Sequence, residues 1–380
     1  MKELLKLARA RSPYTLKLIE RLVKCESPSG EGAAIARVVD LLASELAGLA
    51  HTRKLSGGRF GPHLRCELQL PPNEPADRQI LLLGHSDTVW PLGTIKQRPF
   101  RREGNRLCGP GVLDMKAGLA IAVEAMRILR LLERPLRRRV VLLVNSDEEV
   151  GSLSSRALIE TEARQSAAVL VLEPGTGLEG KLKTARKGVA NYTLRVHGRA
   201  AHAGVDFAAG ANAIVELARQ IQRVASWTRL RRGLTVSPGV VQGGTRSNIV
   251  PEEALALIDV RVPSLTDARE IEEKLRTLRP YDERCRIEVS GGLNRPPMER
   301  SRATAALFRL ARRLGREIGL ELKESSSGGG SDGNFTAALG IPTLDGLGAV
   351  GEGAHAENEF VLAERIPERV ALLAGLIERL

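Results

Sequence analysis

The chain has 380 residues, a length that suits one large domain or two smaller ones. Its composition, 43% hydrophobic and 27% charged, excludes a disordered or collagen-like protein. No apolar run approaches the roughly 20 residues that a membrane-spanning helix needs. Charged residues also interrupt the apolar residues near the N-terminus, so we expect no secretory signal and a cytoplasmic protein that does not bind membranes.

The net charge of +12 raises the question of nucleic-acid binding. Of the 57 basic residues 45 are Arg, and they occur in short clusters along stretches with helical periodicity. Aromatic residues make up only 3% of the chain, which leaves few side chains on which bases could stack. We therefore expect solvated helix faces and no nucleic-acid partner. The four cysteines are far apart and form no CxxC pair, so we expect them to be reduced.

The first half of the chain alternates predicted helices and strands. Residues 1–50 predict two amphipathic helices separated by the turn SPSGEG, and a polar strand-like stretch then leads to the break PPNEPAD at 71–77. Short apolar runs at 80–84, 140–144 and 168–172 are typical of strands buried on both faces. A buried helix is predicted at 118–126, between the first two runs. This order predicts a mostly parallel α/β sheet.

A different pattern begins near residue 187. Alternating stretches at 192–197, 234–242 and 254–262, a strand at 285–290, and helices at 211–224 and 266–278 give the order βαββαβ. From about 303 the helices return, with an apolar run at 342–344 and a final helix at 365–380. We therefore expect an α/β domain in two parts, 1–186 and 297–380, with a smaller α+β, ferredoxin-like domain inserted at 187–296.

Potential metal ligands follow the three apolar runs. His85 and Asp87 follow the first, Glu148 and Glu149 the second, and Glu173 the third. The carboxyl ends of parallel strands are where ligands bind in open α/β sheets. Clustered carboxylates need a cation, and His with Asp and Glu suits zinc or another catalytic divalent ion. Each residue alone is more often a cap or a structural residue, so the prediction rests on their recurrence.

Eight motifs in order resemble the M20 family of metallopeptidases. They are GHSDTVWPLG, GPGVLDMKAG, NSDEEVGS, LEPG, HAG, GGTRSNIVP, SGGGSDGNF and HAENEFV, from about residue 80 to the C-terminus. Within that family the chain looks most similar to glutamate carboxypeptidases of the carboxypeptidase G2 type. The resemblance implies the family's di-zinc, aminopeptidase-like catalytic fold with an inserted lid and dimerisation domain.

The resemblance also implies roles for individual residues. Asp114 would bridge two zinc ions, with cobalt or manganese as possible replacements. His85 and Glu173 would complete one metal site, and Glu149 and His355 the other. The same resemblance makes Glu148 the general base and Asp87 the residue that orients His85. It also leads us to expect a cis peptide between Asp114 and Met115.

Further residues resemble those that contact the substrate. His202 would donate a hydrogen bond to the oxyanion, often across a homodimer formed through the inserted domain. Asn248, Arg261 and Arg295 would hold the terminal carboxylate, since arginine meets a carboxylate in a bidentate manner. Lys181 would contact the side chain of the substrate's leaving residue. Gly330 lies in a loop whose backbone is expected to approach the substrate.

The sequence thus predicts a hydrolase that cleaves the amide of an N-acyl or N-peptidyl L-amino acid, with glutamate as the expected leaving group. An N-acyl amino acid deacylase of the acetylornithine deacetylase or aminoacylase type remains an alternative, because the chemistry is the same and only the acyl pocket differs. A non-catalytic metal-binding protein is a more remote alternative, which the presence of Glu148 disfavours because binding a metal does not require a general base.

Overall fold

The computed structural model describes residues 1–69, 78–133 and 136–380, so the expected break at 71–77 lies outside the described residues. The chain forms two compact units. The larger unit comprises Met1–Ala185, Arg300–Ser327 and Ser331–Leu380, and the smaller comprises Arg186–Glu299 and Gly328–Gly330. Within the described ranges, no helix has the length and apolar character needed to cross a membrane.

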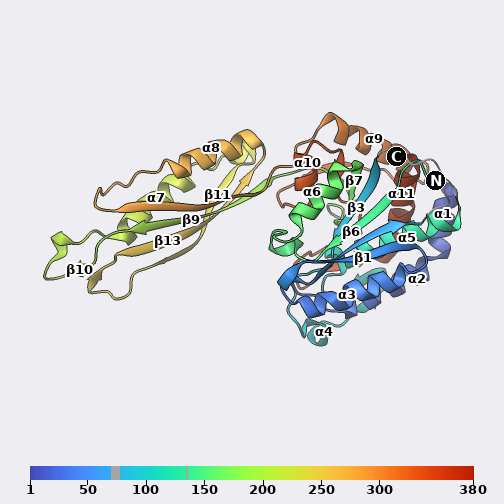
Figure 1. The fold of residues 1–380 in the computed structure, drawn as a ribbon, viewed down its shortest axis with the longest axis horizontal. Coiled ribbons are helices and arrows are strands. Elements are labelled where there is room, and N and C mark those ends of the chain that lie inside the picture. The colour runs from blue at the N-terminus through green and yellow to red at the C-terminus, as the bar shows by residue number, and fades with distance from the viewer. Residues whose placement is uncertain (70–77, 134–135) are drawn as a thin grey trace. The chain divides into compact units, whose positions relative to one another are not determined.

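A six-stranded sheet forms the centre of the larger unit, in the order β1-β2-β6-β3-β7-β16 (Figure 1). Its strands are β1 (Ala50–Ser56), β2 (Pro62–Leu68), β3 (Gln79–His85), β6 (Val140–Asn145), β7 (Ser166–Val171) and β16 (Thr343–Leu344). β3 runs parallel to β6 and β7, and β16 runs parallel to β7, whereas β1 and β2 form an antiparallel edge. The mostly parallel α/β sheet is therefore confirmed, and its central strands are the three apolar runs.

The two faces of this sheet are buried against different helices. Ile80 and Leu82 point into the main core, which includes α5 (Ala117–Leu131) and α11 (Ile366–Arg379). Leu81 and Leu83 point into a smaller cluster with α6 (Arg156–Arg164) and α10 (Gly333–Ala338). Burial on both faces explains why these strands have continuous apolar sequences.

The N-terminal region differs from its prediction. Three helices are present instead of two: α1 (Lys2–Ala10), α2 (Ser12–Lys24) and α3 (Gly32–Glu45). The unexpected break falls at Arg11, just before Pro13 in the first turn of α2. Proline is favoured in a first turn because its missing N–H has no intrahelical partner there. The helical periodicity continues across this break and therefore conceals it.

Shorter elements complete the larger unit. The remaining helices are α4 (Thr94–Gln97) and α9 (Arg302–Arg316). β4 (Arg101–Glu103), β5 (Arg106–Cys108), β17 (Gly351–Glu352) and β18 (Phe360–Leu362) form a small sheet, and β8 (Leu182–Arg186) pairs with β15 (Glu324–Ser327).

A buried arginine ties α11 to the loops beside the central sheet. Arg369 is 1% exposed, and its guanidinium donates to the backbone carbonyls of Gly348, Gly180 and Gly346. Burial lowers the pKa of Arg369 to about 10. The Gly348 amide in turn donates to the carbonyl of Glu173 at 2.9 Å. The C-terminal helix thereby supports the backbone at the end of the third apolar run.

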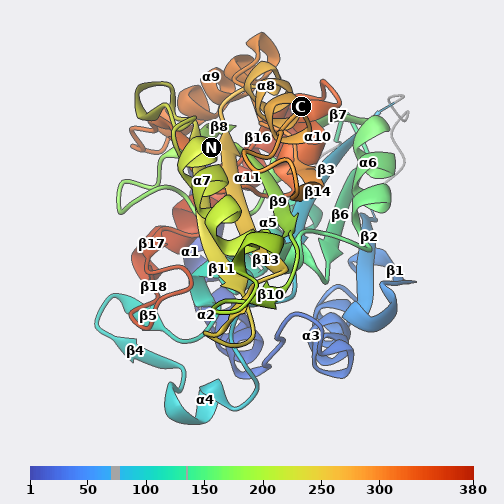
Figure 2. The same ribbon diagram turned by 90° about the vertical axis from the view of Figure 1, so that its left-hand side faces the viewer.

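The smaller unit contains an antiparallel sheet in the order β11-β13-β9-β14, with helices on one face (Figure 2). Its strands are β9 (Gly188–His197), β11 (Thr235–Gly243), β13 (Glu253–Val262) and β14 (Arg286–Arg295). α7 (Ala213–Ala225) and α8 (Leu265–Arg276) share one core with the sheet and cover the same face. The order βαββαβ is as expected, and β10 (Ala201–His202) paired with β12 (Ile249–Val250) is an addition.

Candidate metal centre

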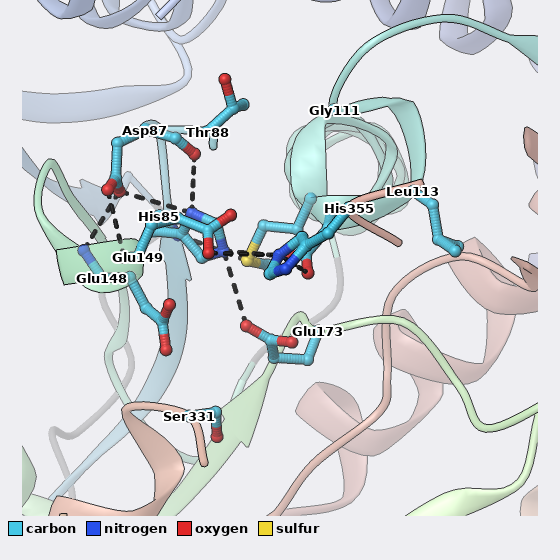
Figure 3. Close-up of polar contacts among 12 residues, drawn as sticks. His85, Asp87, Thr88, Gly111, Leu113, Glu148, Glu149, Glu173, Ser331 and His355 are labelled. Atoms are coloured by element: carbon cyan, nitrogen blue, oxygen red, sulfur yellow. Dashed lines mark hydrogen bonds and ion pairs between the residues drawn. The ribbon is translucent and has the colours of Figure 1, made fainter. Parts of the chain in front are cut away.

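Polar side chains converge at the carboxyl ends of the parallel strands, where Figure 3 shows them facing one another. β3 ends at His85, β6 leads into the 3₁₀ turn Glu148–Val150, and Glu173 lies two residues beyond β7. Asp114 comes from the π-helical turn Val112–Lys116 before α5, and His355 from the loop between β17 and β18. The five residues predicted as metal ligands therefore meet in one place within the larger unit.

Asp114 faces both halves of the cluster. Its Oδ1 lies 3.2 Å from His85 Nε2, and that nitrogen lies 3.5 Å from Glu173 Oε1. Its Oδ2 lies 3.3 Å from His355 Nε2, which lies 3.2 Å from Glu149 Oε2. Each carboxylate oxygen of Asp114 thus belongs to a separate group of ligand atoms.

These separations suit tetrahedral metal sites. Bonds of 2.0–2.2 Å from zinc to nitrogen or oxygen place neighbouring ligand atoms about 3.3–3.6 Å apart. Glu149 Oε1 is also buried without a hydrogen-bond partner among the described residues, which is costly unless a ligand occupies the space beside it. The donor set and its geometry therefore fit two divalent cations that share Asp114.

The titration of the cluster reflects its excess of carboxylates. Hydrogen bonds to Asp114 and Glu149 raise the pKa of His355 to about 10. Burial opposes protonation of His85, but contacts with the carboxylates, Asp114 foremost, raise its pKa well above the ordinary value. Burial also raises the pKa of Glu149. Without a metal the cluster therefore holds protons, which a bound cation would replace.

Asp87 has more partners than the sequence predicted. The ring nitrogen Nδ1 of His85 lies 2.9 Å from the backbone carbonyl of Asp87 and 3.4 Å from its carboxylate. The carboxylate accepts the amides of Glu148 at 3.1 Å and Glu149 at 3.2 Å, and the hydroxyl of Ser29 at 2.7 Å. Burial opposes ionisation of Asp87, but its hydrogen bonds, that from His85 foremost, lower its pKa.

Glu148 lies beside the half of the cluster that contains His85. Its carboxylate, His85 and Glu173 offer ligand atoms within 4.8 Å of one another. The hydrogen bonds from the backbone amides of Glu148 and Glu149 to the Asp87 carboxylate fix the backbone of this turn. A carboxylate held at that distance can receive a proton from a group bound between the residues of the cluster.

One residue at the site was missed in the sequence. Glu359 is 1% exposed, and its carboxylate accepts the amides of Gly111 and Leu113 at 2.8 Å and of Asp114 at 3.1 Å, as well as the indole of Trp90 at 2.9 Å. It fixes the loop that presents Asp114. The available signal was a second acid four residues after His355, in HAENE.

The backbone at two positions of the cluster is unusual. The peptide between Asp114 and Met115 is cis, as expected. His355 has a φ of 63°, in the left-handed region that residues other than glycine seldom adopt. A positive φ at a residue other than glycine is common where a side chain is aimed at a functional site.

Comparison with known proteins identifies the family. Residues 81–379 match the sequence profile described as Peptidase family M20/M25/M40. The chain belongs to this family. It is 30% identical over 376 residues to carboxypeptidase G2 from Pseudomonas sp. (strain RS-16), covering 96% of this chain and 89% of that protein. The M20-family chain is accordingly a hydrolase of the metallopeptidase type.

Solved structures share its fold. The aminopeptidase PepT from Bacillus cereus ATCC 10987 superposes with a TM-score of 0.79 at 22% identity, over 97% of this chain and 98% of that one. The YXEP protein of Bacillus subtilis, described as a dinuclear metal binding peptidase of the M20 family, gives a TM-score of 0.71 at 15% identity, covering 98% of each chain. M20-family architecture therefore extends over both units.

In the smaller unit of this M20-family protein, His202 and Asn248 lie together. β10 and β12 pair His202 with Ile249, and the amide of Ala203 donates to the Asn248 carbonyl at 3.0 Å. His202 Nδ1 accepts the amides of Gly204 and Val205, both at 3.1 Å. An unprotonated Nδ1 leaves the proton on Nε2, so the exposed ring presents a donor.

Arg261 and Arg295 lie at the other end of the same sheet. Both are paired with Val189, whereas His197, next to the His202 end, is paired with Glu253. The ten residues of β13 separate the two ends by roughly 30 Å. Within one smaller unit, Asn248 and the two arginines therefore lie at opposite ends of the sheet.

Local contacts of the remaining candidates are also defined. Arg261 forms a two-pronged contact with Asp259, with its Nε 2.8 Å from Oδ1 and its Nη2 2.9 Å from Oδ2. A Cβ at Gly330 would lie 2.8 Å from Cδ of Arg295, so the glycine is required for this packing. The ammonium of Lys181 lies 2.7 Å from Glu179, in a surface turn of the larger unit.

Proposed function

We propose that this protein is a di-zinc carboxypeptidase that cleaves N-acyl or N-peptidyl L-amino acids with a free terminal carboxylate. The observation that carries the proposal is the position of Asp114, whose two oxygens face two separate sets of ligand atoms. His85 and Glu173 would hold one ion, and Glu149 and His355 the other. Cobalt or manganese could replace zinc, because nitrogen and oxygen ligands also accept those metals.

The chain's own residues supply the proton transfers. Two divalent ions held by these residues would supply Lewis-acid activation of a water molecule and of the amide carbonyl. Glu148 would accept the proton of that water and deliver it to the nitrogen of the leaving amine, as a general base and then a general acid. Asp87 holds the backbone amide of Glu148, and this fixes the point from which the carboxylate reaches the reacting atoms.

His202 would donate the hydrogen bond from Nε2 to the developing oxyanion. We propose that it does so in a homodimer, with His202 and Asn248 of one protomer serving the site of the other. The separation of Asn248 from Arg261 and Arg295 along β13 supports this division, since a single carboxylate cannot contact both ends of one sheet. The exposed apolar side chains of Ile214 and Val241 on α7 and β11 offer a surface for pairing.

Glutamate is the leaving amino acid that we propose. Arg295 and Arg261 would bind its α-carboxylate, and Lys181 its side-chain carboxylate. The basic net charge of the chain favours anionic substrates in general. Because Lys181 pairs with Glu179, the substrate's carboxylate would have to replace that partner.

The test compares kcat/KM for N-acyl glutamate, glutamine and leucine, in the wild type and in Lys181→Ala. A preference for glutamate of about tenfold or more in the wild type, corresponding to about 1.4 kcal/mol, is expected. Lys181→Ala should lose that preference and retain activity on leucine. Lys187→Ala, six residues further along the chain, provides a control for the loss of one positive charge.

A wild type that prefers leucine or another uncharged residue would contradict glutamate release. Hydrolysis of N-acetyl amino acids without preference for the leaving residue would favour the deacylase alternative. A protein that binds two metal equivalents but hydrolyses none of these amides would instead be a metal-binding protein.

A further inference from the structure

A buried histidine outside the metal cluster has no role in the mechanism above. His63, on β2, is 1% exposed and lies between two serines of the segment that follows β6. Its Nδ1 is 2.9 Å from the hydroxyl of Ser146, and its Nε2 is 3.2 Å from the hydroxyl of Ser154. These serines enclose the turn that contains Glu148 and Glu149.

The hydrogen bonds define a direction. Ser154 Oγ lies 2.8 Å from Asp147 Oδ2, an acceptor, so the Ser154 hydroxyl donates to Asp147. Its oxygen then accepts Nε2–H of His63, which leaves Nδ1 unprotonated and 2.9 Å from the Ser146 hydroxyl, whose second acceptor is the Gly61 carbonyl at 3.2 Å. This series of hydrogen bonds, from Ser146 through His63 and Ser154 to Asp147, gives both ring nitrogens of a neutral imidazole a partner. Burial lowers the pKa of His63, which agrees with a neutral ring.

The ring has little freedom to move. A Cβ at Gly57 would lie 2.8 Å from His63 Cε1 and 2.9 Å from Nε2, so the β1–β2 connection lies directly against it. Asp147 is fully buried and also accepts the Ser154 amide. The imidazole therefore links a strand of the rigid sheet to both sides of the turn.

The turn is held from a second direction by Asp87. The amides of Glu148 and Glu149 donate to the Asp87 carboxylate, which fixes the middle of the turn. The serine contacts of His63 fix the residues before and after it. Loss of either support would let the two glutamates move relative to the rest of the cluster.

We propose that His63 is a positioning residue that fixes the Glu148–Glu149 turn through Ser146, Ser154 and Asp147. This inference rests on the proposed function for the consequence that it predicts in turnover, but not for the structural restraint itself. A displacement of about 1 Å at a catalytic group can cost on the order of 100-fold in rate. His63 would thereby affect catalysis without touching the substrate.

The experiment uses His63→Leu, Ser154→Ala and the double variant in the full-length, metal-loaded protein. His63→Leu should lower kcat about tenfold or more and change KM less than about twofold, because the substrate contacts remain. Ser154→Ala should lower kcat in the same way. The double variant should lose little more than the worse single variant, since both substitutions break one chain of hydrogen bonds.

Gln79→Met is the matched control. Gln79 is fully buried at the start of β3, and its amide donates to Glu162 at 2.8 Å, at the end of the strand opposite His85. Its replacement should reduce stability without changing kcat. If His63→Leu does not fold, Ser154→Ala provides the same comparison, and His63→Gln, which retains a donor towards Ser154, should keep more of the wild-type kcat than Ser154→Ala.

Amide hydrogen exchange gives a readout that does not need a substrate. In His63→Leu, residues 146–154 should exchange faster than in the wild type, whereas Gln79→Met should leave this segment unchanged. Unchanged exchange with wild-type kcat would overturn the positioning role, as would multiplicative losses in the double variant. A wild type inactive on every acyl amino acid would contradict the proposed function alone, and the exchange result would still decide the role of His63.

Discussion

The carboxylate of Asp87 accepts the backbone amide of Glu148 at 3.1 Å. The residue expected to orient a metal ligand therefore also holds the main chain of Glu148, the proposed general base. The Glu148 side chain is left to act at the cluster, while its main chain is fixed. A substitution of that side chain should consequently change the chemistry and leave the fold intact.

Glu148→Gln should retain the fold and both metal ions but lower kcat by about 10²–10⁴-fold, because the amide cannot accept the proton of the attacking water. Turnover and metal content measured on the same preparation test this. Glu352→Gln, an exposed acid in β17, is the control. Turnover near that of the wild type would exclude Glu148 from the mechanism.

Asp114→Ala should lose both metal ions, since each of its oxygens faces one half of the cluster. His355→Ala should weaken chiefly one site, because its contacts are to Glu149 and a single oxygen of Asp114. Elemental analysis after dialysis against a weak chelator measures the difference. Two full equivalents of metal in Asp114→Ala would refute the shared site.

Glu359→Gln should destabilise the metal-free protein by about 1–3 kcal/mol, because an amide nitrogen would face backbone donors that now bind a carboxylate. The free energy of unfolding from urea titration measures this loss. Metal affinity should fall as well, since the loop that presents Asp114 loses its support. Glu357→Gln, in an exposed position of the same motif, should change neither quantity.

The sequence was most informative where the fold imposes a pattern. The apolar runs at 80–84, 140–144 and 168–172 predicted the parallel strands, because a continuous apolar sequence indicates burial on both faces. The acids after these runs predicted the cluster, because the sequence shows where each strand ends. Glu359 and His63 were not found, because their roles depend on contacts with residues 245 or more and 83 or more positions away. The break at Arg11 was also missed, because the spacing of apolar residues is the same in one long helix and in two consecutive helices.

The stability of the metal-free protein should fall as the pH rises from about 6.5 towards 10. Contacts with Asp114 and Glu149 raise the pKa of folded His355 to about 10 from an ordinary 6.5. Because the pKa is raised on folding, protonation stabilises the folded state fully below the pKa of the unfolded state. This contribution is lost as the pH rises through the pKa of the folded state. Melting temperatures of chelator-treated protein test the trend, and His355→Asn should show a weaker one. A melting temperature that rises over this range would contradict the assignment.

His202→Ala and Glu148→Gln should each be nearly inactive alone. Mixed and allowed to exchange subunits, they should regain activity, because one site of the heterodimer would then contain both residues. Subunit exchange must be verified with differently tagged chains. Exchanged but inactive mixtures would show that His202 acts within its own chain or has no part in turnover.

The three carbonyls around Arg369 have a consequence for acid tolerance. A buried guanidinium paired with an acid loses its partner when that acid is protonated, but backbone carbonyls do not titrate in this range. We therefore expect the attachment of α11 to the loops at Gly180 and Gly348 to persist in acid and at high ionic strength. Acid denaturation should accordingly begin at the carboxylate cluster, and the C-terminal helix should be among the last elements to detach.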